Sequence, residues 1–183
     1  MSIPDETHLI AELDAAAGAL VGRRITGVAY YGLSAERSVA WDYDTWHRPV
    51  MGVELVIDDG TRYSAVWDTP FGHFSLQLSA SPMSAHLALA AEGGNCTRWT
   101  VQDHRRWAPL LASPVVESRL IWSADLTDSG KTAPAALHLG FPSGSAWIIA
   151  AMENGDSWWL GADEVVVAFT RDMAARIGVR DPA

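Results

Sequence analysis

The chain has 183 residues, of which 49% are hydrophobic and 19% charged, with a formal net charge of −9 from 22 acidic and 13 basic residues. This composition is typical of a folded domain and excludes an intrinsically disordered chain, which combines low hydrophobicity with high net charge. The negative charge opposes binding to nucleic acids or anionic membranes; it serves solubility in general, or attraction to a basic partner.

The first residues and the cysteine content both point to the cytoplasm. The chain starts with an acidic segment, whereas a secretory signal starts with a positively charged region. No apolar run reaches the roughly 18 to 20 residues that a membrane helix needs. Cys96 is the only cysteine, so no disulfide can form within the chain. We therefore predict a cytoplasmic protein without a membrane segment.

Helices are predicted at the N-terminus, in the middle and at the C-terminus. In the first of them, Leu9, Leu13 and Leu20 share one helix face with alanines, while acidic residues occupy the other face. The predicted helices cover residues 4–20, 83–91, 105–112 and 171–177.

Most of the remaining chain follows strand patterns. Asp58-Asp59-Gly60 separates two β-prone runs, which is a strong hairpin signal. The acidic, aromatic segment 37–49 is predicted to be a loop, and residues 125–134 a turn. In chain order, the predicted strands are residues 25–31, 53–57, 61–67, 74–78, 115–122, 136–141, 146–152, 158–160 and 164–169.

Two predicted hairpins share one pattern, apolar-x-apolar-x-apolar-x-x-Gly-x-x-aromatic. Alternating apolar residues bury one face of a sheet, and glycine permits the turn. The sequence thus predicts a single β-rich α+β domain over residues 1–183, built from two related halves, with an internal duplication of 5–92 and 98–178. The matched positions are Val53, Leu55, Ile57, Gly60 and Tyr63 in one hairpin and Leu137, Leu139, Phe141, Gly144 and Trp147 in the other.

No catalytic motif, metal-ligand pattern or cofactor signature is found, so catalytic residues, metals and cofactors are left unassigned and enzymatic activity is not favoured. The segment 41–73 is the richest in residues that can do chemistry. Its carboxylates and imidazoles could transfer protons or bind a metal if they met in space, but Asp42, His47, Asp68 and His73 need not meet. The simpler interpretation is an ordered loop with surface charges, in which Asp68 caps a turn.

Nine tryptophans are a high number for this length, and most should lie in the core. Trp158 and Trp159 are adjacent, and neighbours on a strand point to opposite faces, so one of them is expected to be exposed, to cover a pocket or to contact a partner. The candidate ligand- or partner-binding residues are Trp46, His47, Asp68, His73, Trp158 and Trp159.

Three stretches of the sequence form a recognisable set: GALVGRRITGVAYYGL, RWAPLLASPVVESRLIW and WWLGADEVVVAF. Through them most of the chain resembles small proteins of high-GC bacteria that have no assigned activity. The acidity, aromatic content and hairpin pattern also resemble, more loosely, the small α+β immunity proteins encoded beside bacterial toxins. The second resemblance has no specific motif, so it implies no functional residue.

Two functions of different classes fit these observations. The first is a non-enzymatic binding protein, an immunity or accessory factor that contacts a protein partner through exposed aromatic residues. The alternative is a small-molecule-binding protein or enzyme with a pocket between the halves, walled by the candidate residues, in which His47 or His73 would act as general base. A homodimer formed through an edge strand is a third interpretation.

Overall fold

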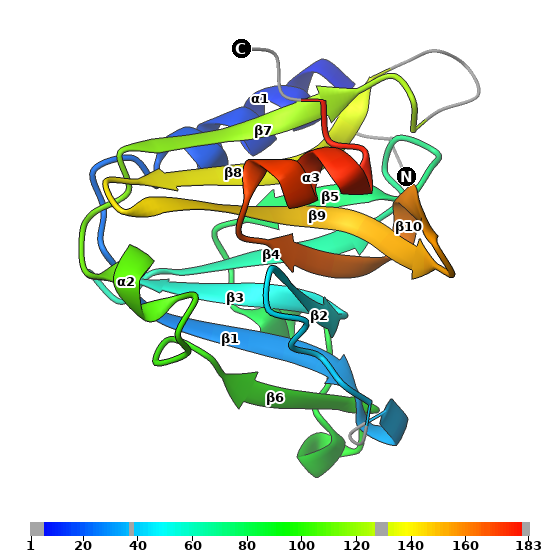
Figure 1. Ribbon diagram of the computed structural model, residues 1–183, viewed down its shortest axis with the longest axis horizontal. Helices are drawn as coiled ribbons and strands as arrows, with labels where there is room; N and C mark the ends of the chain where they lie inside the picture. Colours follow the sequence, from blue (N-terminus) through cyan, green and yellow to red (C-terminus); the bar gives the residue numbers. More distant parts are fainter. Residues whose placement is uncertain (1–5, 37–38, 127–131, 181–183) are drawn as a thin grey trace.

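The computed structural model describes residues 6–36, 39–126 and 132–180. Two five-stranded sheets, all of whose pairings are antiparallel, pack against each other, and short helices lie outside them (Figure 1). This confirms the predicted β-rich α+β class. The first sheet has the order β5 (Ser75–Ser79), β4 (Arg62–Asp68), β3 (Gly52–Ile57), β1 (Ile25–Leu33), β6 (Cys96–Thr100). The second has the order β2 (Trp46–Val50), β10 (Ser157–Ala168), β9 (Gly144–Asn154), β8 (Ala133–Phe141), β7 (Glu117–Ser123).

The helices occupy the predicted regions of the chain. Helix α1 (Glu6–Gly18) lies against β7 and β5, and α3 (Arg171–Ile177) covers the outer face of the second sheet over β9 and β10 (Figure 1). Helix α2 (Ala108–Leu111) is a single turn before β7. The main core lies between the sheets, and a second core lies between the second sheet and α3. Burial on both faces explains why every residue of β8 is buried.

Each sheet contains a four-stranded meander that follows a helix. In the first sheet β1, β3, β4 and β5 are neighbours in chain order, and in the second sheet β7 to β10 are. The fifth strands are exchanged: β2 leaves the first meander to pair with β10, whereas β6, which precedes the second meander, pairs with β1. The two exchanged strands pair differently: β2 adds to the last strand of the second meander, whereas β6 adds to the first strand of the first meander. The internal duplication stays a prediction.

Both predicted hairpins form, as β3–β4 and β8–β9, but the residue match between their second strands is wrong. Leu55 faces Tyr63 in the first hairpin, whereas Leu139 faces Ala146 in the second, which is one residue shorter. A shift of one residue moves a strand side chain to the opposite face. Tyr63 therefore packs between the sheets, while Trp147 packs on the outer face beneath α3.

Three other expectations differ from the structure. The predicted loop 37–49 contains most of β2, and β6 was not predicted, because short edge strands depend on distant pairing partners more than on local pattern. The predicted helix 83–91 is two 3₁₀ turns, Met83–Ala85 and Ala90–Glu92. The two strands predicted after residue 157 are one strand, β10, with a register shift between Leu160 and Val165. Residues 4–5 of the first helix and 127–131 of the predicted turn lie outside the described residues.

A sharp corner carries the chain from the second sheet to the first. Only Met51 separates β2 from β3. Val50 has φ of 75°, a left-handed conformation that costs a β-branched residue on the order of 1–3 kcal/mol. At Gly52 an added Cβ would lie 2.7 Å from the carbonyl oxygen of Ala65. The corner therefore needs glycine on one side and holds a strained valine on the other.

The last helix depends on a cap that a single substitution should remove. The Thr170 side chain accepts a hydrogen bond from the amide of Met173 at 3.1 Å. We expect Thr170→Ala to lower the free energy of unfolding by about 1 kcal/mol, measured by urea denaturation. Thr69→Ala, at an exposed position in the β4–β5 loop, is the control and should change stability by less than about 0.5 kcal/mol. Equal effects of the two substitutions would contradict a capping role.

Candidate functional site

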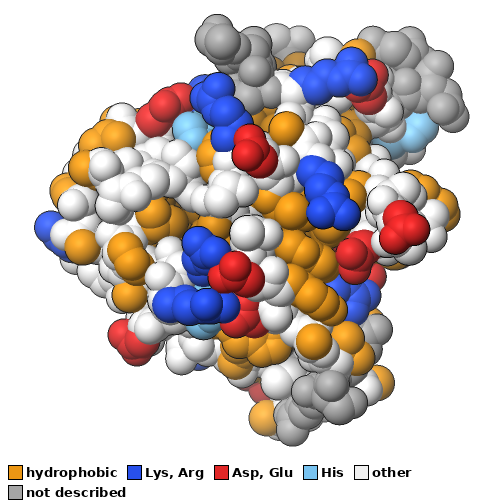
Figure 2. All heavy atoms as spheres, in the orientation of Figure 1, with side chains coloured by type: hydrophobic (Ala, Val, Ile, Leu, Met, Phe, Trp, Pro, Cys, Tyr) orange, Lys and Arg blue, Asp and Glu red, His pale blue; other side chains and the backbone are white. Residues whose placement is uncertain are grey.

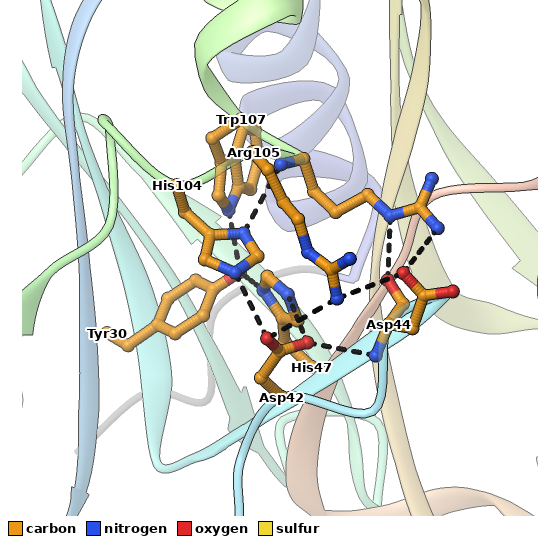
Figure 3. Close-up of polar contacts among 8 residues, drawn as sticks. Tyr30, Asp42, Asp44, His47, His104, Arg105 and Trp107 are labelled. Atoms are coloured by element: carbon orange, nitrogen blue, oxygen red, sulfur yellow. Dashed lines mark hydrogen bonds and ion pairs between the residues drawn. The ribbon is translucent and has the colours of Figure 1, made fainter.

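A cluster of titratable side chains lies where the exchanged strands bring the two sheets together (Figure 3). Tyr30 comes from β1, Asp42 from the segment before β2, and His47 from β2 itself. The loop between β6 and α2 supplies His104 and Trp107. We call Asp42, His47 and His104 the Asp–His cluster.

The proton positions in the buried part of the cluster follow from its donors. Trp107 Nε1 can only donate, and it lies 2.6 Å from Tyr30 Oη. Tyr30 Oη lies 2.8 Å from His47 Nδ1. Donation to this nitrogen gives the buried hydroxyl proton an acceptor, whereas the opposite direction leaves that proton without one among the described residues. Neutral His47 then carries its proton on Nε2. That atom is buried, lies 3.4 Å from Asp42 Oδ1 and makes no hydrogen bond.

Asp42 accepts hydrogen bonds from its own segment and from the loop between β6 and α2. Its Oδ1 accepts the amide of Asp44 at 2.9 Å, and its Oδ2 lies 3.1 Å from His104 Nε2. The amide of Arg106 donates to His104 Nδ1 at 3.3 Å, so the proton of a neutral His104 is on Nε2 and points to Asp42. Both imidazoles thus point toward the Asp42 carboxylate (Figure 3).

Two arginines neutralise the second carboxylate of this region. Asp44 Oδ1 lies 2.8 Å from Arg106 and 3.1 Å from Arg105, and Arg105 also lies 3.9 Å from Asp42 Oδ2. Figure 2 shows a group of Arg or Lys, Asp or Glu and His side chains on this face. Because the arginines are engaged mainly by Asp44, the charge of Asp42 is compensated only in part.

Burial and hydrogen bonding set the charge state of the cluster. Burial, together with the nearby positive charges, lowers the pKa of His47 to about 3, so His47 is neutral near pH 7. Burial raises the pKa of Tyr30 well above its ordinary value. Burial alone would raise the pKa of Asp42, but the hydrogen bonds from Asp44 and His104 outweigh it and hold the pKa below its ordinary value. The cluster is therefore one carboxylate facing a neutral buried imidazole.

A pocket of about 550 Å³ lies beside the cluster, between the edges of the two sheets. Strands β1 and β6 form one wall, and β2 with the segment before it forms the other. The ring of Trp99 packs directly over Gly32, where an added Cβ would lie 3.0 Å from the indole. The lining residues are Gly32, Leu33, Val39, Ala40, Trp41, Arg48, Pro49, Val50, Thr97 and Trp99.

Trp41 stands between the pocket and the cluster. Its ring centroid lies 5.0 Å from that of His47, 5.6 Å from that of His104 and 6.0 Å from that of Trp99. Arg48, on β2 in the same wall as Trp41, forms a bidentate pair with Glu164 at 2.6 and 2.9 Å.

The chemistry of the cluster follows from these contacts. Each imidazole turns one nitrogen toward Asp42 and uses the other within the protein, so neither nitrogen serves a ligand in the pocket as a proton acceptor. Asp42, His47 and His104 are the described residues that could together hold a metal ion.

Of the predicted candidates, only His47 enters the cluster. It lies close to Asp42, which was one of the two alternatives that the sequence left open, and its ring is buried. Its neighbour Trp46 points to the other side of β2, where it stacks on Tyr43 and contacts Trp158 edge-on. Trp46 and Trp158 therefore belong to the core beneath α3.

The other candidates lie elsewhere. Asp68 is exposed at the end of β4 and accepts the amide of Thr69 at 2.7 Å, as expected for a turn cap. His73 is half-buried in the loop between β4 and β5. Within the part of the chain that the structure describes, neither is joined to the cluster and neither lines the pocket. Trp159 is 55% exposed while Trp158 is partly buried, as the alternation of a strand requires.

Sequence reasoning did not identify Tyr30, His104 or Trp107 as members of a site. His104 is 62 residues from Asp42, and Trp107 is 77 residues from Tyr30. No local spacing links positions so far apart. The local signal is Arg105-Arg106 next to His104, and two adjacent arginines do not by themselves indicate a binding site.

A scan against protein-family models, a search of curated proteins and a search of solved structures each find no match to this chain. The resemblance to small proteins of high-GC bacteria, and the looser one to immunity proteins, stay predictions. The same holds for the protein partner, the homodimer and the cytoplasmic location. Among the described residues, no helix is long and apolar enough to cross a membrane.

Proposed function

We propose that the protein binds a small, flat and largely apolar organic molecule in the pocket between the sheet edges. The observation that carries this proposal is the pocket itself, about 550 Å³ in volume with the indoles of Trp41 and Trp99 in its wall. Ligand pockets in proteins commonly measure about 300–1,000 Å³ and are lined mainly by apolar and aromatic groups.

The polar groups of the wall favour an uncharged ligand. Arg48 is already paired with Glu164, and the hydroxyl of Thr97 lies 3.0 Å from that of Ser34. A charged ligand would have to compete with these contacts, whereas a planar ring can stack on the indole of Trp41 or Trp99 without breaking them.

Backbone strain supports a binding role for this place in the fold. Val50, in the pocket wall, keeps a left-handed conformation that glycine or asparagine would adopt at lower cost. Strained residues persist where the surrounding structure holds them, and they cluster at binding sites. Here the strained residue lies both in the pocket wall and at the corner between β2 and β3.

The uncharged fluorescent probe N-phenyl-1-naphthylamine tests this proposal, with binding read from probe emission and tryptophan quenching. Thr97→Phe fills the pocket from β6, and we expect it to weaken probe binding by about 10-fold or more, because a buried phenyl ring displaces the ligand. Thr100→Phe makes the same substitution on the same strand but points to the opposite face, and it should leave binding unchanged.

Failure of the wild-type protein to bind the probe, or equal loss in both variants, would overturn the proposal. Unfolding curves of the two variants establish that each is folded under the assay conditions. Native mass spectrometry of the protein purified from its own host then identifies the physiological ligand by its mass.

A further inference from the structure

We propose that Asp42, His47 and His104 bind a divalent transition-metal ion of the Zn²⁺ type. This inference is independent of the proposed ligand pocket, because it rests on a different set of atoms. The three side chains each offer one ligand atom, and these atoms all lie within 4.8 Å of one another.

The spacing suits a shared ion. Zinc binds imidazole nitrogen and carboxylate oxygen at about 2.0–2.2 Å, which places neighbouring ligand atoms about 3–3.5 Å apart. His47 Nε2 lies 3.4 Å from Asp42 Oδ1, and His104 Nε2 lies 3.1 Å from Asp42 Oδ2. Only a small approach of the two imidazoles is needed to complete the site.

The buried nitrogen of His47 is the observation that favours a cation over a purely structural contact. Nε2 is fully buried and makes no hydrogen bond, although it faces a carboxylate. A buried polar atom without a partner costs about 1–3 kcal/mol, and a coordinated ion removes that cost.

The contacts behind His47, on the side of its Nδ1 atom, resemble those of a metal-binding histidine. The N–H group on the other ring nitrogen of a metal-binding imidazole usually donates a hydrogen bond to an acceptor that the protein holds in place. Tyr30 Oη, held by Trp107 at 2.6 Å, lies 2.8 Å from His47 Nδ1. It donates to that nitrogen when His47 carries its proton on Nε2, and accepts from it once the proton has moved to Nδ1. Asp42 is fixed in turn by the amide of Asp44.

The ligand types select the ion. Two imidazoles and one carboxylate suit Zn²⁺, Fe²⁺, Ni²⁺ or Cu²⁺, whereas Mg²⁺ and Ca²⁺ prefer oxygen ligands alone. Three protein ligands leave at least one position for water. Partial exposure of Asp42 and His104, at 32% and 18% of their side chains, provides the entry path.

Coordination requires a change of tautomer at both histidines, which makes the proposal specific. The proton of His47 moves from Nε2 to Nδ1, where Tyr30 Oη accepts it, and the proton of His104 moves in the same way. His104 Nε2 can bind an ion only when its proton moves to Nδ1, and Nδ1 then no longer accepts the amide of Arg106. We expect the Arg106 amide resonance to shift when Zn²⁺ is added to ¹⁵N-labelled protein.

Metal titration provides the main test, with Zn²⁺ followed by calorimetry and Co²⁺ by its visible absorption. We expect one ion per chain. Asp42→Asn and His104→Gln should each weaken binding by about 10-fold or more, because each removes one ligand of three. Both positions are partly exposed, so these variants should fold. His138→Gln is the matched control, since His138 is buried beside the carboxylate of Glu117 but lies outside the cluster.

Arg105→Ala separates an ion site from a structural cluster. Arg105 is 64% exposed and lies 3.9 Å from Asp42 Oδ2, so its removal relieves repulsion of a cation. We expect metal binding to tighten by roughly 2- to 10-fold at low salt, and less at high salt. A structural cluster without an ion would show no such gain.

The proposal is overturned if the wild-type protein binds no ion, or if Asp42→Asn and His104→Gln bind as tightly as wild type. It is also overturned if His8→Ala abolishes binding, because His8 and Glu12 form an exposed pair at 3.2 Å that can hold an ion adventitiously. Probe binding in the pocket is measured on the same variants, so failure of one proposal is distinguished from failure of the other.

Discussion

Replacing Tyr30 by phenylalanine should lower the free energy of unfolding by about 2–4 kcal/mol. The Tyr30 hydroxyl is the shared partner of Trp107 Nε1 at 2.6 Å and His47 Nδ1 at 2.8 Å. Removing one oxygen therefore leaves two buried polar atoms without partners, and each costs about 1–3 kcal/mol. The loss comes from desolvation rather than from packing, because phenylalanine keeps the ring.

Chemical denaturation followed by circular dichroism measures this effect. Tyr63→Phe is the matched control, because Tyr63 is also buried between the sheets and its hydroxyl has no hydrogen-bond partner among the described residues. We expect the control to change stability by less than about 1 kcal/mol. Similar losses in both variants would show that the hydroxyl of Tyr30 does not hold the cluster together.

Replacing Glu54 by glutamine should destabilise the protein by about 2–3 kcal/mol. Glu54 is 1% exposed, on the outer face of the first sheet. Its Oε1 lies 2.9 Å from Arg62, and its Oε2 accepts the amide of Met83 at 2.9 Å. Glutamine has one carbonyl oxygen, so one of these two donors would face an amide NH₂ group. Arg62 is half-exposed and can turn to water, which limits the loss.

Two measurements check this second prediction. Denaturation of Glu54→Gln is compared with that of Glu153→Gln, an exposed position on β9 that should be neutral. Hydrogen exchange should become faster at the Met83 amide, because Glu54 ties the 3₁₀ turn Met83–Ala85 to β3. Unchanged exchange at Met83, with stability retained, would show that the buried carboxylate does not anchor the turn.

The elements that carry these residues differ in how well they can be predicted from the sequence. The hairpin of Leu55 and Tyr63 was predicted because its alternation and its Asp-Gly turn are local. Strand β2 was missed although it contains His47, because its pairing partner β10 lies more than a hundred residues away. Pro49 and the charged neighbours of β2 also give it a loop-like composition.

The candidate site was predicted even less completely than the fold. The acids and aromatics around His47 predict a binding residue, and Asp42 is a residue that it could meet. Asp68 and His73 had the same kind of neighbourhood, yet they lie in the β4–β5 region, outside the cluster. Proximity in sequence carried no information on which loops fold over which sheet edge.

The sequence by itself determined the secondary structure class, most strands, the hairpins and the burial of alternating residues, because these depend on side-chain periodicity and turn chemistry within a few residues. Only the tertiary structure decided that β2 and β6 change sheets, that Tyr30, Asp42, His47 and His104 meet, and that a pocket opens beside them. The reason is physical: strand exchange is decided by long-range hydrogen bonds and core packing, whose partners are far apart in the chain.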